Sequence, residues 1–209
     1  MTEFALVLPV LLGAGLMGLE AANQAIIQMK VNQIAVQVAD NASRIGDTSF
    51  LASKKIYESD INDVFTGANI LGGSALDIFE NGRVIVSSLE VVPGQDDDQY
   101  FHWQRCKGVK NHTSRYGAEG FGAGGGFKGV GPSGEEVRAY DDEAVIYVEI
   151  SYDYQPVVSS SFSFAETISA SASFTVRDKR DITQIYQRNS GSPDPIASCD
   201  VFDGFAVAS

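Results

Sequence analysis

The chain has 209 residues, of which 44% are hydrophobic, enough for one ordinary domain with its own core and an additional segment. This composition excludes a disordered protein. Fifteen Lys and Arg against 27 Asp and Glu give a formal net charge of -12. Because such a chain repels phosphate backbones, we do not expect it to bind nucleic acid.

The N-terminal segment is apolar and uncharged from Phe4 to Leu19. Its sixteen residues would form a helix about 24 Å long, which is marginal for spanning a bilayer. No Lys or Arg occurs in the first 29 residues, and no small-residue cleavage site ends the apolar run. We therefore expect a basic leader to be missing and the segment to be retained as part of the protein.

A single helix is predicted from about residue 2 to residue 45. Its first half is apolar all round, whereas its second half is amphipathic. The second half carries one apolar stripe at spacings of four and three, which continues until Gly46. This stripe consists of Ile27, Val31, Ile34, Val38, Ala42 and Ile45. The amphipathic second half of such a helix would pack on a head domain. The apolar first half would lie in lipid or among other apolar helices. An ordinary membrane anchor is the alternative.

Two features of the apolar run favour an assembly role over a simple anchor. Glu3 lies at its start, where an ionised carboxylate in a bilayer requires a partner. Pro9 removes one helix hydrogen bond, and Gly13, Gly15 and Gly18 weaken the helix while allowing close approach of a second helix.

Residues 47–209 are expected to form a head outside the membrane. Asp47 to Ser49 is predicted to cap a short helix whose apolar side begins at Leu51 and which ends before Gly67. A hairpin is predicted next, in which Asn81-Gly82 joins strands at 75–79 and 83–92.

Further strands follow at 100–106 and 144–154, which are rich in aromatic and β-branched residues. Strict alternation marks another strand at 168–176, and a last one is predicted at 182–186. A long helix followed by an antiparallel sheet is an α+β fold. The domain division is therefore a membrane and assembly helix at 1–46 and an extracytoplasmic α+β head at 47–209.

The segment 108–134, called the Gly-rich loop below, contains many glycines and little periodicity. Loops of this length are often functional, so it is predicted to be a subunit contact or a recognition surface. It has no GxxxxGK[ST] sequence, which argues against a nucleotide site.

The two cysteines, Cys106 and Cys199, are far from any CxxC spacing. A disulfide between them, and with it an oxidising compartment, is the favoured interpretation. Two unrelated buried thiols are the alternative.

No cofactor, metal or catalytic group is predicted. His102 and His112 are the only histidines and lack the spacing of zinc ligands. The run Asp96-Asp97-Asp98 lacks the spaced pattern of calcium loops, so a solvated turn is favoured over a calcium site. With no nucleophile elbow, the chain is expected not to be an enzyme.

Three segments carry a resemblance to a known family: TEFALVLPVLL at 2–12, WQRCKG at 103–108, and VEISYDYQP at 148–156. Together with the Gly-rich loop, they are similar to the TadE-like pseudopilins, relatives of type IV pilins that belong to the tight-adherence (Tad/Flp) pilus system. The resemblance extends over roughly residues 2 to 186.

The resemblance implies a pilin-like subunit held in the bacterial inner membrane by its helix and later assembled, with its own copies or other pilin subunits, into an extracellular pilus. A prepilin peptidase and the pilus assembly machinery would be its partners. In the family a retained glutamate, here Glu3, pairs with a neighbour's freed N-terminus, although this chain places it third where mature pilins have it fifth. The assembly helix would use Glu3, Phe4, Pro9, Leu12, Gly13 and Leu16.

Two functions of different classes follow. The first is a non-enzymatic structural subunit of a Tad-type pilus or related filament. The second is a membrane-anchored adhesin that recognises a ligand through the loop at 108–134.

Overall fold

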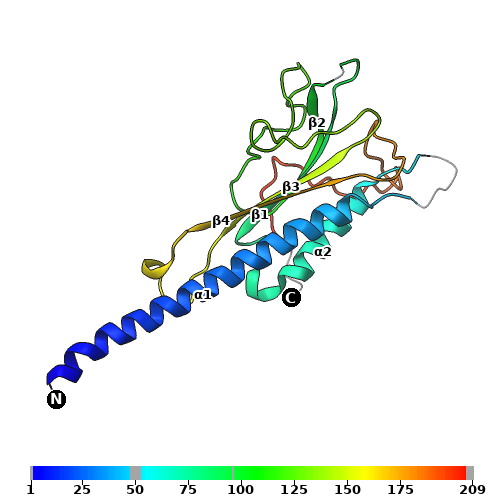
Figure 1. The fold of residues 1–209 in the computed structure, drawn as a ribbon. Coiled ribbons are helices and arrows are strands. Elements are labelled where there is room, and N and C mark those ends of the chain that lie inside the picture. The colour runs from blue at the N-terminus through cyan, green and yellow to red at the C-terminus, as the bar shows by residue number, and fades with distance from the viewer. Residues whose placement is uncertain (1, 48–52, 96, 206–209) are drawn as a thin grey trace.

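The computed structural model describes residues 2–47, 53–95 and 97–205, with side chains from Val7 onward. One long helix, α1, runs along a twisted sheet and projects beyond it at its N-terminal end (Figure 1). The chain therefore has the predicted α+β fold, with a helical stem and an antiparallel sheet. No observation tests the domain division at residue 46, which stays a prediction.

Helix α1 spans Thr2–Ala42 and includes Pro9 without interruption, close to the predicted range of 2–45. Its C-terminal end is capped by a side chain that is distant in sequence. The buried guanidinium of Arg180 donates to the carbonyl oxygens of Ser43 at 2.9 Å and Ile45 at 2.6 Å. The guanidinium also donates to the carbonyl oxygen of Ala42, the last helix residue, at 3.4 Å, so it holds the end of the helix and the turn that follows it.

The second helix, α2, spans Glu58–Leu76, so the predicted short helix ending before Gly67 was wrong at both ends. The Asp60 carboxylate accepts a hydrogen bond from the Tyr57 N–H at 3.1 Å and starts the helix later than expected. The helix continues past Gly67 and packs on α1, but it is kinked at Gly73, whose φ of 59° and ψ of -179° are not helical. It ends at Leu76, and the following Asp77 has a left-handed conformation. The predicted cap residues 48–49 and Leu51 lie outside the described residues.

Four antiparallel strands form one sheet in the order β2-β1-β3-β4. Their bounds are β1 Gly82–Val91, β2 Gln99–Lys107, β3 Val145–Asp153 and β4 Thr167–Thr175. The predicted strands at 83–92, 100–106, 144–154 and 168–176 are thereby confirmed to within two residues.

The predicted hairpin across Asn81-Gly82 was wrong. The partner segment 75–79 completes α2 and a turn, and β1 pairs instead with β2 and β3. Gly82 is needed for close approach, because a Cβ there would lie 2.7 Å from the carbonyl oxygen of Ser151. The expected last strand at 182–186 was also wrong, since the described part of the chain makes only an isolated bridge there, between Tyr57 and Tyr186.

The main core lies between one face of the sheet and the two helices. From α1 it takes the stripe that the heptad-like spacing predicts, with Val31, Ile34 and Val38 at most 3% exposed. A smaller cluster on the opposite face joins Leu89, Phe101, Val145 and Tyr147 to the Gly-rich loop and the segment after it. Each face of the sheet therefore packs against a core cluster, whereas residues 7–19 of α1 belong to neither cluster.

Candidate functional site

The first half of α1 lies outside the fold. Between residues 7 and 19, called the projecting segment below, eight large apolar side chains are 41–70% exposed. They are Val7, Leu8, Val10, Leu11, Leu12, Leu16, Met17 and Leu19. A soluble monomer rarely exposes so large an apolar surface, so this surface requires a cover of lipid or protein.

Within the described residues, α1 is the one helix that is long and apolar enough to cross a membrane. The core helix of a soluble protein can be equally long and apolar, but it is mostly buried. Here, however, the apolar window is mostly uncovered, which a core helix is not. The structure therefore agrees with a membrane-compatible N-terminal helix.

The residues predicted to mediate assembly all belong to the N-terminal part of α1. Leu12 and Leu16 are 58% and 43% exposed, and a Cβ placed on Gly13 would meet nothing within 4 Å. The side chains of Glu3 and Phe4 lie outside the described residues, although their backbone belongs to α1. The roles of these residues in assembly stay predictions.

Glu20 marks the point where α1 enters the head. Its side chain is completely buried, directly after the projecting segment. The carboxylate accepts hydrogen bonds from the hydroxyl of Tyr154 and from the backbone N–H groups of Val157 at 3.3 Å and Val158 at 2.7 Å. A buried carboxylate requires such donors, and all three come from the end of β3 and the loop that follows it.

One turn further along α1, Gln24 binds the other end of the same loop. Its amide donates to the carbonyl oxygen of Ala165 at 3.0 Å and accepts from the N–H of Phe164 at 2.8 Å. Asn23 donates to the Tyr154 hydroxyl at 2.7 Å. These three helix residues and the segment 154–165 form what is called the junction below.

Sequence reasoning missed the junction. Glu20 stood out only as the first charge after the apolar run, and Tyr154 only as the last residue of the predicted strand 144–154 and as part of the resemblance. Nothing local indicates that the two meet, because Glu20 and Tyr154 are 134 residues apart in the chain.

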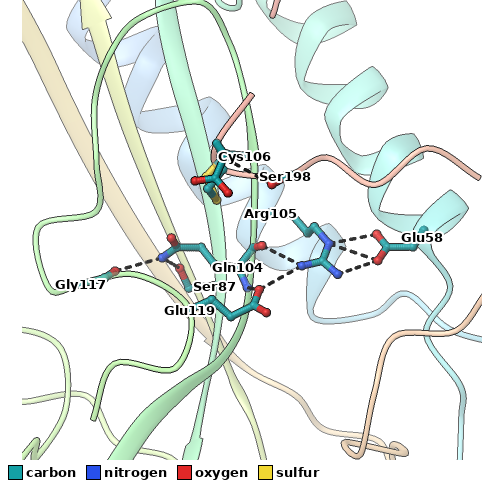
Figure 2. Close-up of polar contacts among 10 residues, drawn as sticks. Glu58, Ser87, Gln104, Arg105, Cys106, Gly117, Glu119 and Ser198 are labelled. Atoms are coloured by element: carbon teal, nitrogen blue, oxygen red, sulfur yellow. Dashed lines mark hydrogen bonds and ion pairs between the residues drawn. A yellow bond between two sulfur atoms is a disulfide. The ribbon is translucent and has the colours of Figure 1, made fainter. Parts of the chain in front are cut away.

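The second polar cluster lies on the outer edge of β2 (Figure 2). The guanidinium of Arg105 binds both carboxylate oxygens of Glu58 from α2, with the shortest contact at 2.6 Å. It also contacts Glu119 of the Gly-rich loop at 3.1 Å. Beside it, the Gln104 amide donates to the Ser87 hydroxyl at 2.9 Å. This cluster joins a helix, a strand and a loop, so its contacts stabilise the head.

The predicted disulfide is present between Cys106 on β2 and Cys199 in the C-terminal segment, across 93 residues. The backbone N–H of Cys106 also donates to the carbonyl of Ala197 at 2.8 Å, and that of Gly108 to Asp203 at 2.9 Å. The C-terminal segment is thus held along one end of the β2 edge by a covalent bond and by backbone hydrogen bonds.

The Gly-rich loop covers the other end of the same edge. The N–H of Phe101 donates to the carbonyl of Phe121 at 3.0 Å, and that of Gln99 donates to Phe127 at 2.7 Å. Phe127 and Tyr116 pack against the smaller core cluster, while Phe121 stays 48% exposed. The Gly-rich loop therefore stabilises the head by pairing with β2 and by packing on the smaller core cluster.

The residues considered for metal binding are separated. His102 contacts Glu90 at 2.9 Å on one end of β2, and His112 lies in the loop beyond the other end. Asp98 forms an ion pair with Lys128 at 2.8 Å, while Asp96 lies outside the described residues. Across 2–47, 53–95 and 97–205, no group of three His, Cys, Asp or Glu side chains is placed to hold a metal ion.

Comparison with known proteins identifies no relative: no family model, no curated protein and no solved structure matches this chain. The fold, the projecting segment and the junction are thus the observations on which a function can be based.

Proposed function

We propose that this protein is a non-enzymatic, pilin-like structural subunit. Its N-terminal helix holds it in the inner membrane and afterwards packs among the helices of other subunits in a Tad-type pilus or related filament. The proposal joins the resemblance of the sequence to TadE-like pseudopilins with the uncovered state of the projecting segment.

One observation carries the proposal. Helix α1 is continuous from Thr2 to Ala42, yet its second half is part of the head's core while the large apolar side chains of the projecting segment stay 41–70% exposed. A rigid rod of this kind transmits any contact made by the apolar end directly to the head. Before assembly, lipid would surround the apolar surface of the projecting segment. In the filament, the apolar helices of neighbouring subunits would replace the lipid.

The head supplies two supporting features. The disulfide between Cys106 and Cys199 suits an oxidising compartment outside the cytoplasm. The net charge of -12 keeps heads soluble and discourages nonspecific contact with nucleic acid. Both fit a head that faces outward from the membrane.

In the assembled state the small residues of the projecting segment allow close helix approach, since the space around Gly13, Gly15 and Gly18 is open. By resemblance, Glu3 pairs with the N-terminus of a neighbouring subunit. A buried carboxylate in an apolar bundle requires a partner of this kind.

The test is to express the full chain in its native cell and to measure its membrane fraction and its filaments by electron microscopy. Replacing Leu12 and Leu16 with Asp should remove the protein from the membrane fraction and abolish filaments. The matched control is Ile70→Asp, which alters an apolar side chain 75% exposed on the head and should change neither. Glu3→Gln should keep the membrane fraction and reduce filament number.

A monomer that stays in the membrane fraction and never appears in filaments would contradict the proposal. That result would instead favour the anchored adhesin. Deleting the exposed tip of the Gly-rich loop around Phe121 would then be the next variant to test for loss of ligand binding.

A further inference from the structure

The loop 155–165 forms most of the connection 154–166 between β3 and β4; it is uncharged, contributes no buried residue, and is followed by the exposed acid Glu166. It carries two large apolar side chains in the open, Val157 at 67% exposed and Phe164 at 68% exposed. A single exposed apolar residue needs no explanation, but here two lie in one uncharged loop whose backbone is bound to α1 directly after the exposed apolar residues 7–19.

Both exposed residues are fixed in place by α1. The N–H of Val157 donates to Glu20, and the N–H of Phe164 donates to Gln24. The loop therefore lies beside the helix directly where the projecting segment ends (Figure 1). Its two apolar side chains cannot move far from this level without breaking the junction.

The length of the helix places this level at a membrane surface. The uncharged residues 4–19 extend about 24 Å, somewhat less than the roughly 30 Å thickness of a hydrocarbon core. Glu20 follows at once, and its carboxylate is shielded by the loop. When residues 4–19 span the bilayer, the loop lies in the boundary between headgroups and acyl chains.

We propose that the loop 155–165 is a membrane-interface element that inserts Val157 and Phe164 among lipid headgroups and fixes the height and tilt of the head above the bilayer. This inference rests on the membrane stage of the proposed function. The occupant is lipid because the loop is bound to α1 at Glu20, directly where the exposed apolar side chains of the projecting segment end.

The composition of the loop also predicts which lipids are sufficient for its insertion. With no Lys or Arg between residues 154 and 165, the loop has no group that favours anionic headgroups. Its insertion is driven by burial of apolar side chains alone. It should therefore occur in neutral phosphatidylcholine and be insensitive to salt.

The test uses the full chain in phosphatidylcholine vesicles with and without brominated acyl chains, which quench nearby tryptophan. Phe164→Trp and Val157→Trp report on the loop independently, and Leu12→Trp reports on helix insertion. Tyr140→Trp is the matched control, because it is 74% exposed and precedes the opposite end of β3. The native Trp103 is 6% exposed in the head and is subtracted as background.

The proposal expects a blue shift and quenching for both loop reporters and for Leu12→Trp, with no change for Tyr140→Trp or on adding salt. Quenching of Leu12→Trp without quenching of either loop reporter would overturn this inference and leave the membrane stage intact. Absence of quenching at Leu12→Trp would instead defeat the membrane stage itself. Equal quenching of the Tyr140→Trp control would also overturn the proposal, because the head would then lie on the lipid without a defined contact.

Discussion

The hydroxyl of Tyr154 donates a hydrogen bond to the buried carboxylate of Glu20, which joins the end of β3 to the first head-bound turn of α1. Burial, followed by this contact with Glu20, raises the pKa of Tyr154 above its ordinary value, so the phenol stays a donor at physiological pH. Among residues 7–42 of α1, whose side chains the structure describes, Glu20 carries the only buried carboxylate, and it lies at the boundary between the projecting segment and the head.

The first prediction concerns this carboxylate. Glu20→Gln should speed hydrogen exchange at the backbone N–H groups of Val157 and Val158, because a carboxamide offers one acceptor oxygen where the carboxylate offers two. Exchange mass spectrometry of the loop 155–165 would measure it. Gln155→Ala, an exposed change in the same loop, is the control and should leave the exchange unchanged. Unaltered exchange in Glu20→Gln would show that the loop is held by other contacts.

The second prediction concerns the disulfide. Replacing Cys106 and Cys199 together by Ser should lower the free energy of unfolding by about 4 kcal/mol, because the bond closes a loop of 93 residues in the unfolded chain. Denaturant unfolding with and without a reductant would measure the effect. The double variant itself should not respond to reductant. A wild-type unfolding midpoint that reductant does not move would contradict the prediction.

The third prediction concerns the ion pair between Glu58 and Arg105, whose side chains are 4% and 13% exposed. Arg105→Met should destabilise the head by about 3–5 kcal/mol, because it leaves a buried carboxylate without its partner. Adding Glu58→Leu should recover much of the loss. Arg44→Met is the control: its ion pair with Asp40 has side chains 74% and 31% exposed, and its loss should cost about 0–1 kcal/mol. Thermal unfolding of these three variants and of the wild-type protein would measure the differences.

The fourth prediction concerns the pH dependence of stability. The hydrogen bond to Glu90 raises the pKa of His102, so protonated His102 contributes stability that is complete below its unfolded pKa of about 6.5 and is lost as the pH rises through the folded pKa. Burial lowers the pKa of His112, so its contribution has the opposite sign and is lost as the pH falls.

The measurement is the free energy of unfolding between about pH 5 and pH 9, the range in which histidines titrate. His102→Gln should flatten the decline on the alkaline side, whereas His112→Gln should flatten the decline on the acid side. Each variant serves as the control for the other. A His102→Gln curve that keeps the wild-type slope above neutral pH would contradict the assignment.

Local sequence patterns were sufficient for most elements of the fold. The 3.6-residue period predicted α1, and alternation or β-branched runs predicted β2, β3 and β4, because in each case one face must reach the core. Local patterns gave a wrong prediction for residues 67–82, where they indicated the end of a helix and a hairpin. There the Asn81-Gly82 pair is a strong hairpin signal locally, but contacts of α2 with α1, and pairing of β1 with β3, decide the conformation.

By itself, the sequence determined that the chain has an uncharged apolar rod, an antiparallel head and two cysteines able to pair, since these depend on composition and short-range period. Only the tertiary structure decided where the rod leaves the head and what holds it there. Glu20 and Gln24 find their partners more than 130 residues away, through the sheet that places the loop 155–165 beside α1. No local pattern encodes such a contact, because it exists only once both segments are packed on the same core.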